Sequence, residues 1–168
     1  MFIAHVPSGY ILADLLDKKL KPNLLSRKAF YSTIMLGAIF PDIDLFYFYF
    51  LDQRSVHHHQ YFLHWFSVWI PLFLLAFAAW KIFKQHTKFA FIAMLFSGAA
   101  LLHICLDTFV GDVWLFAPFI NRSYVFFEVT ARYQPWWLNF IFHWSFLVEL
   151  VICAYAFILY IRKNKALK

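Results

Sequence analysis

The stretch FAFIAMLFSGAALLHICLDTF, residues 89–109, decides the fold class of this 168-residue chain. It is long enough to cross a bilayer as a helix, which takes about 20 predominantly apolar residues. Two ionisable side chains, His103 and Asp107, stand in its second half. They are four residues apart and therefore share one face of a helix. Since ionisable groups are costly at membrane depth, the pair predicts a buried functional site in a membrane helix.

The composition of the whole chain agrees with a membrane protein. Hydrophobic residues make up 63% of it and aromatic residues 23%, with only 4 Gly and 6 Pro. This apolar content exceeds that of ordinary soluble domains and excludes disordered and collagen-like chains. Cys105 and Cys153 lie in apolar runs without a Cys-x-x-Cys pattern, so we interpret them as core residues and not as a disulfide or a thiolate metal site.

Five apolar segments organise the chain. They cover residues 2–16, 29 to about 51, 61–80, 89–109 and 136–161. We expect an all-α, polytopic helical membrane protein with about four to five membrane-embedded helices, one of them broken at Pro41. Residues 1–168 should form a single integral membrane domain. Because the lysines follow the first segment, we expect that segment to be retained and not cleaved as a signal peptide.

The basic residues predict an orientation in the membrane. Of the 15 Lys and Arg residues, 12 follow the first, third or fifth segment, and only Arg54, Arg122 and Arg132 fall on the other side. The positive-inside rule then puts the N-terminus outside and the C-terminus in the cytoplasm. Since the basic residues flank apolar segments and form no stripe with interleaved aromatics, we expect no nucleic-acid partner despite a net charge of +6.

Seven residues of the types that bind metals recur among these segments. They are His5, Asp42, Asp44, His59, His64, His103 and Asp107. At about 1.5 Å per helical residue, His5, Asp42 and His103 lie roughly 20–22 Å from the cytoplasmic ends of the first, second and fourth segments. His64 falls just inside the outer end of the third segment. This shared depth predicts one metal site in the outer leaflet.

Each candidate also has a structural interpretation. A chain break at Pro41 would turn Asp42 and Asp44 toward a common centre, although Asp42 could instead cap a helix. His103 and Asp107 could form a hydrogen-bonded pair within their helix, and a lone His5 could be a satisfied core histidine. The buried His143 and Glu149 could support the site or simply join helices.

The order and spacing of these residues resemble a known family. The motifs are His5-x-x-x-Gly9, Gly37-x-x-x-Pro41-Asp42-x-Asp44, His59-x-x-x-x-His64 and His103-x-x-x-Asp107-x-x-x-Gly111, with Pro118 downstream. Together they resemble the YdjM-like (LexA-binding) inner-membrane-associated family, which is described as metal-dependent hydrolases. The resemblance implies a multi-pass protein of a bacterial-type cytoplasmic membrane with a metal centre. The third motif departs from the family pattern at its flanks, which leaves the ligand among His57, His58 and His59 open.

The ligand types suggest a chemistry. Imidazoles with carboxylates suit Zn²⁺, with Mn²⁺ or Fe as alternatives, and the number of candidates allows one or two ions. Such a centre activates water and stabilises charge on a phosphoryl oxygen. We therefore expect hydrolysis of a lipid or lipid-linked phosphate at the outer leaflet, with Asp42 and Asp44 as catalytic residues. Arg122 and Arg132 would bind the phosphate of this membrane-lipid substrate.

The alternative is a non-catalytic metal-binding membrane protein that acts in transport, in sensing or as a regulatory scaffold. Transport would predict polar residues that continue to the cytoplasmic end, where these segments carry almost none. A scaffold would need a broader basic surface than the short connection at residues 81–88 offers.

Overall fold

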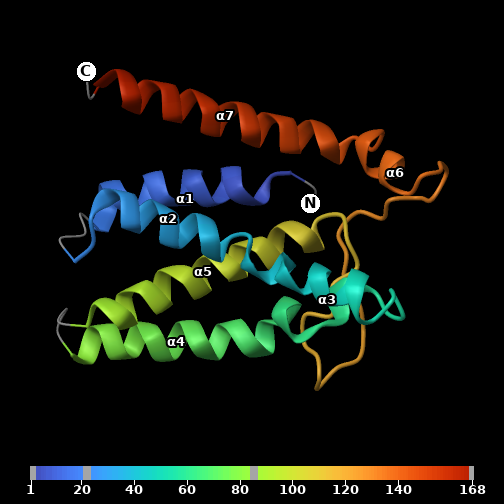
Figure 1. The fold of residues 1–168 in the computed structure, drawn as a ribbon, viewed down its shortest axis with the longest axis horizontal. Helices are drawn as coiled ribbons and strands as arrows, with labels where there is room; N and C mark the ends of the chain where they lie inside the picture. Colours follow the sequence, from blue (N-terminus) through green and yellow to red (C-terminus); the bar gives the residue numbers. More distant parts are fainter. Residues whose placement is uncertain (1–2, 21–23, 84–86, 167–168) are drawn as a thin grey trace.

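The computed structural model describes residues 3–20, 24–83 and 87–166 (Figure 1). Its helices are α1 (His5–Leu20), α2 (Arg27–Gly37), α3 (Asp44–Phe50), α4 (Phe66–Ile82), α5 (Lys88–Thr108), α6 (Trp137–Ile141) and α7 (Ser145–Ala166). The short 3-10 turns are η1 (Phe40–Ile43), η2 (His58–Gln60) and η3 (Phe62–His64). Within the described ranges no strand forms, and β pairing is limited to one bridge between Val113 and Tyr124. The prediction of an all-α fold is confirmed.

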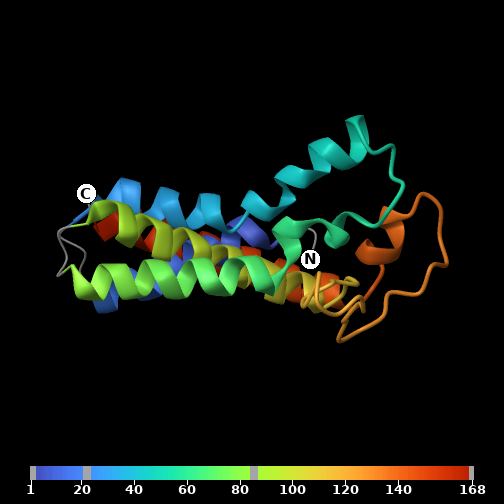
Figure 2. The same cartoon turned by 90° about the horizontal axis from the view of Figure 1, so that it is seen from below.

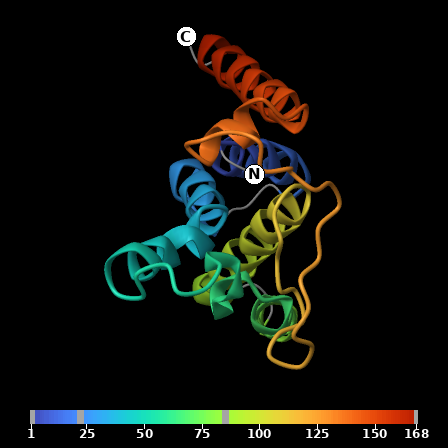
Figure 3. The same cartoon turned by 90° about the vertical axis from the view of Figure 1, so that its right-hand side faces the viewer.

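The long helices form an elongated bundle with two different ends. Figures 1 and 2 show α1, α2, α4, α5 and α7 running between these ends in alternating directions. The basic end carries the last residues of α1, α4 and α7 and the first residues of α2 and α5. The loop end, seen face on in Figure 3, carries α3, α6 and the irregular segments 51–65 and 109–136. All the short polar elements η1, η2 and η3 therefore lie in the half of the molecule that ends in loops.

The helices that could cross a membrane are fewer than expected. Among the described residues, only α5 and α7 are long and apolar enough by themselves, and α2 with η1–α3 adds a third span if that bent pair is counted as one. The expectation of four to five was therefore too high. α1 has 16 residues and α4 has 17, both short of the roughly 20 that a full crossing takes. Residues 61–65 and 142–144, counted as helix in the sequence, form turns instead.

The predicted break at Pro41 is confirmed. α2 ends at Gly37, the chain turns through η1, and the two halves meet at a bend of 60°. Proline lacks the amide donor that a continuous helix needs, so η1 accommodates it at its beginning. In Figure 2, α3 leaves the axis of the bundle at this point. The bend directs Asp42 toward the last turns of α5.

Gly37 lets α2 approach α5 closely at the bend. A Cβ atom built on Gly37 would lie 2.4 Å from the carbonyl oxygen of Phe96 and 3.0 Å from the Cβ of Ala99. Small residues allow such backbone contacts between membrane helices. The close approach of α2 and α5 thus holds η1, and with it Asp42, against the helix that carries His103.

We expect Gly37→Ala to lower the free energy of unfolding by about 1–3 kcal/mol, because the added methyl group meets backbone atoms that cannot yield. Gly98→Ala is the matched control, since its Cβ would meet only a ring atom of Phe73, at 3.3 Å. Unfolding in detergent micelles, followed by circular dichroism, measures both variants. Equal stability of the two would show that the close contact at Gly37 does not matter.

Polar contacts attach α7 to α1 at both of its ends. Near the loop end, Glu149 Oε2 accepts hydrogen bonds from the backbone amides of Ile3 at 2.6 Å and Ala4 at 3.2 Å. These amides precede α1, where a helix leaves its donors unsatisfied. At the basic end, Lys163 forms an ion pair with the buried Asp14. The structure thus gives Glu149 a role in joining helices.

His143 also has a local structural role. Its Nδ1 atom lies 2.8 Å from the hydroxyl oxygen of Ser145 and accepts from the Ser145 amide at 3.4 Å. Ser145 is the first residue of α7, so His143 helps to begin that helix. It does not line the cavity described below.

The orientation in the membrane stays a prediction, and cysteine labelling tests it. Cys105 and Cys153 are first replaced by Ser, and a single Cys is then introduced at Lys88 or Arg122, both of which are exposed. We expect a membrane-impermeant maleimide added from outside to label Arg122→Cys and to spare Lys88→Cys. The reverse pattern would put the basic end outside.

Candidate metal centre

Imidazoles and carboxylates gather where η1, η3 and α5 meet. Asp42 comes from η1, His64 from η3, and His103 and Asp107 from the end of α5. One ligand atom from each of the four lies within 4.8 Å of all the others. His64, His103 and Asp107 are buried, whereas the side chain of Asp42 is 25% exposed. The four groups therefore form a compact centre that is open on the side of Asp42.

The distances suit a single small ion. Asp107 Oδ2 lies 2.8 Å from His103 Nε2 and 3.7 Å from His64 Nε2. Asp42 Oδ1 lies 3.5 Å from His103 Nε2 and 3.7 Å from His64 Nε2. Tetrahedral ligands around Zn²⁺, at about 2.0–2.1 Å from the ion, are separated by roughly 3.3–3.4 Å. Small movements of His64, His103 and Asp107 would form three positions of such a shell and leave the fourth, on the side of Asp42, for a water molecule.

Hydrogen bonds behind two of the imidazoles fix their orientation. His103 Nδ1 donates to the carbonyl oxygen of Ala38 at 2.8 Å, and His64 Nδ1 donates to Asp44 Oδ2 at 2.8 Å. Each Nε2 atom therefore presents its lone pair to the centre. Both Nε2 atoms are buried and face the carboxylates of Asp42 and Asp107. Metal-binding histidines commonly have such a carbonyl or carboxylate behind them, so the residues fit an ion.

Asp107 also contacts two further imidazoles. His5 Nε2 lies 3.1 Å from Asp107 Oδ1, and His59 Nε2 lies 3.7 Å from Asp107 Oδ2. His59 is oriented by its Nδ1 atom, which lies 2.9 Å from the carbonyl oxygen of Asp112. The ring of His5 stacks on that of His103, with 3.9 Å between their centroids. Asp107 is therefore the residue through which most of the candidate ligands meet.

A second group of possible ligands adjoins the first. Ligand atoms of His58, His59 and His64 also lie within 4.8 Å of one another. Burial lowers the pKa of His58 to about 3 and holds the pKa of His59 well below its usual range. Both imidazoles are thus neutral at neutral pH, which is the form that binds metals. Of the three adjacent histidines left open by the sequence, His58 and His59 face the centre and His57 is exposed.

Gly111 makes room for His59. A Cβ atom on Gly111 would lie 2.9 Å from His59 Cε1. Any larger residue would displace the imidazole from its position beside Asp107. The glycine of the fourth motif thus supports the site by its small size.

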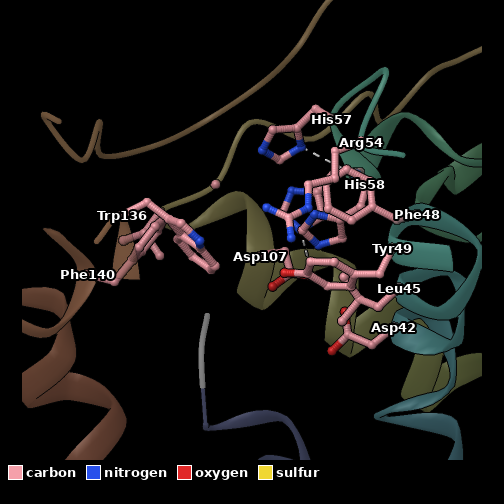
Figure 4. Close-up of a pocket in the computed structure, with 13 residues that line it drawn as sticks. Asp42, Leu45, Phe48, Tyr49, Arg54, His57, His58, Asp107, Trp136 and Phe140 are labelled. Atoms are coloured by element: carbon pink, nitrogen blue, oxygen red, sulfur yellow. Dashed lines mark hydrogen bonds and ion pairs between the residues drawn. The ribbon is translucent and has the colours of Figure 1, made fainter. Parts of the chain in front are cut away.

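A cavity of about 630 Å³ opens onto the centre (Figure 4). It is lined by Asp42, Leu45, Phe48, Tyr49, Arg54, His57, His58, His59, Asp107, Val110, Gly111, Trp136 and Phe140. The buried Asp107 and His59 form its floor, and the exposed Arg54 and His57 stand at its rim. Its volume is typical of sites for small molecules. The cavity gives a ligand a route from the loop end to the polar centre.

Some of the residues predicted for the site line the cavity, and others do not. All seven candidate ligands belong to one network of contacts, but Asp44 lies behind His64 and does not line the cavity. Arg122 and Arg132 do not line it either. The guanidinium carbon of Arg122 lies 5.7 Å from the ring centroid of Tyr124. The arginine that lines the cavity is Arg54, which could not be distinguished from the other two by sequence alone.

We expect Asp44→Ala to weaken metal binding by about 10- to 100-fold, the usual effect of removing the group that orients a ligand histidine. Asp44→Asn keeps an oxygen that can accept from His64 Nδ1, so its loss should be smaller. Competition with a chromophoric chelator measures both affinities in detergent. An unchanged affinity in Asp44→Ala would mean that His64 is no ligand or does not need this support.

The comparisons with known proteins agree with the motifs. The sequence profile of one protein family, described as YdjM inner membrane protein, matches residues 1–166, nearly the entire chain. No curated protein matches the chain, and no solved structure does. The resemblance of the four motifs is thereby confirmed at the level of the family.

Proposed function

The chain belongs to the YdjM inner membrane protein family, and we propose that it is a metal-dependent hydrolase of a lipid-borne phosphoester. Its location in the inner membrane follows from the family and from the apolar helices. The observation that carries the proposal is a cluster of four possible ligands, two of which, Asp42 and Asp107, line a largely apolar cavity. Such a cavity with a few convergent polar groups is the usual form of an active site.

Two imidazoles and two carboxylates suit Zn²⁺, with Mn²⁺ and Fe as alternatives. When bound, the ion would act as a Lewis acid and lower the pKa of a coordinated water molecule. His64, His103 and Asp107 would hold it, with Asp42 beside the open position, and the Ala38 carbonyl and Asp44 would keep the imidazoles in place. The adjoining group of His58 and His59 offers a place for a second ion beside Asp107.

The two aspartates of the second motif have separate roles in this proposal. Asp42 both faces the ligand atoms and lines the cavity, so we assign to it the acceptance of a proton from the attacking water. The side chain of Asp44 is only 6% exposed and is engaged with His64. Asp44 is therefore a positioning residue that acts through His64 and does not touch the substrate.

The walls of the cavity favour a substrate with an apolar tail. Leu45, Phe48, Tyr49, Trp136 and Phe140 line it beside the polar floor. Phe48 and Tyr49 belong to α3, which is part of the bent span, so the walls lie next to the lipid phase. A phospholipid or a lipid-linked phosphate matches an apolar wall that ends in a metal centre. The outer leaflet follows from the predicted orientation.

Turnover by the purified protein tests this function. We expect zinc-loaded protein to hydrolyse a detergent-dispersed lipid phosphate faster than a short-chain soluble analogue, and a chelator to abolish the activity. Equal rates on the two substrates, or activity that resists chelation, would overturn the proposal. Bound metal with no turnover of either substrate would instead favour the alternative, a metal-binding protein that acts in transport, sensing or regulation.

A further inference from the structure

Arg54 stands in a strained loop between α3 and η2. Gln53 has a φ of 51° and Arg54 a φ of 64°, both in the left-handed region. Glycine adopts this conformation at much lower cost than residues with a side chain. Strain of this kind persists where the surroundings fix the backbone, and it gathers at functional sites. An arginine at such a position therefore calls for an explanation in terms of its side chain.

Hydrogen bonds hold the loop in this shape. The amide of Arg54 donates to the carbonyl oxygen of Phe48 at 3.0 Å. Asp52 Oδ2 accepts from the Ser55 amide at 3.1 Å and from the Tyr61 hydroxyl at 2.6 Å. The loop is thus tied both to α3 and to the segment that leads to His64. These bonds fix the point from which the Arg54 side chain starts.

The side chain itself is directed along the wall of the cavity. Its guanidinium carbon lies 4.8 Å from the ring centroid of Tyr49, within the range of a cation–π contact. Tyr49 and Arg54 both line the cavity, and Figure 4 shows them together with His57 and His58 around its opening. The contact with Tyr49 keeps the guanidinium at the rim of the cavity.

The charge of Arg54 is not neutralised by a carboxylate. The Lys and Arg residues in ion pairs within the described ranges are Lys18, Arg27 and Lys163, all near the basic end. Asp42 and Asp107 are the carboxylates that line the cavity, and a divalent ion between them would balance their charge. With the ion in place, the guanidinium of Arg54 gives the cavity a net positive charge.

We propose that Arg54 binds the anionic head of the substrate and makes the cavity selective for lipid phosphates over zwitterionic lipids. The inference rests on the proposed hydrolase function for the nature of the head group. A guanidinium donates two parallel hydrogen bonds to a phosphate and attracts its charge. A positively charged cavity disfavours a quaternary ammonium group. A head group held by Arg54 next to the metal centre would leave its tail along Phe48 and Tyr49.

Binding of dodecyl phosphate and of dodecylphosphocholine to the full-length, zinc-loaded protein in neutral detergent tests the proposal. We expect the wild-type protein to prefer dodecyl phosphate. Arg54→Ala should weaken that binding by about 10- to 100-fold, because a charge-assisted contact is lost, and should change phosphocholine binding little. Arg54→Lys keeps the charge but lacks the planar guanidinium group. Its affinity for dodecyl phosphate should therefore lie between those of the wild type and Arg54→Ala.

Two variants exclude indirect effects. Arg54→Gly removes the side chain and relieves the left-handed strain, so it should lose binding without a fall in the unfolding temperature. Arg162→Ala removes an exposed arginine at the basic end and should bind as the wild type does. Zinc content is measured in every variant and should not change.

The outcomes separate this inference from the proposed function. Unchanged binding in Arg54→Ala, or a wild-type protein without preference for dodecyl phosphate, would overturn the role of Arg54 even if the protein hydrolyses lipids. A loss in Arg122→Ala but not in Arg54→Ala would also overturn it. Selective binding through Arg54 without any turnover would support the inference and count against the hydrolase.

Discussion

Asp107→Asn should remove the bound metal, with affinity reduced by more than about 100-fold. Loss of a group that only orients a ligand costs 10- to 100-fold, and loss of a central ligand should exceed that range. Asp107 is within 3.7 Å of four imidazoles, namely His5, His59, His64 and His103. Asparagine preserves the shape of the side chain, so the loss should reflect charge and coordination and not packing.

Elemental analysis of protein purified without added chelator measures this effect. Asp112→Asn is the matched control, because Asp112 is an exposed carboxylate just beyond α5. It should retain the full complement of metal. His103→Ala should lose metal as Asp107→Asn does, while circular dichroism in detergent shows that both variants keep their helices. Full metal retention in both would remove the basis of the proposed centre.

Asp42→Asn should lower kcat on a lipid phosphate by about 10²- to 10⁴-fold, the range expected when a general base is lost. Asp42 contacts two imidazoles, whereas Asp107 contacts four, so metal affinity should fall less than in Asp107→Asn. KM should change little, because the tail contacts and Arg54 are unaltered. Single-turnover rates, measured on protein reloaded with zinc, separate this effect from metal loss.

A matched comparison comes from Asp44→Asn, which alters the neighbouring carboxylate behind His64. Its kcat should recover once the metal site is saturated, whereas that of Asp42→Asn should not. If Asp42→Asn keeps the wild-type rate at full metal occupancy, another group accepts the proton.

The clustering of the candidate ligands could be predicted from the sequence because each residue carries a local signal. His103 and Asp107 are one helical turn apart, and Pro41 marks the break that directs Asp42 inward. Ionisable residues in apolar segments are rare enough to stand out without any knowledge of tertiary structure. The different positions of Asp42 and Asp44 could not be predicted, since they depend on the 60° bend.

The arginine at the cavity escaped prediction for a related reason. Arg54, Arg122 and Arg132 have equivalent charge and lie on the same side of the predicted membrane. Only the hydrogen bonds of the loop after α3 separate them, and these link Asp52 to the distant Tyr61. The number of membrane spans was overestimated because α1 and α4 are too short to cross by themselves. The apolar residues 61–65 have the same composition as α4, which they precede.

The centre draws its ligand atoms from η1, η3 and α5, and no one of these elements supplies more than two of the four. An ion bound there is therefore thermodynamically linked to the assembly of the bundle: it stabilises the packed arrangement over separately inserted helices by its own binding free energy. Asp107 is the last of the four to be synthesised, so the ion can bind only after α5 has joined the helices before it. Supply of the ion would then favour the packed fold in the membrane without being required for the helices themselves.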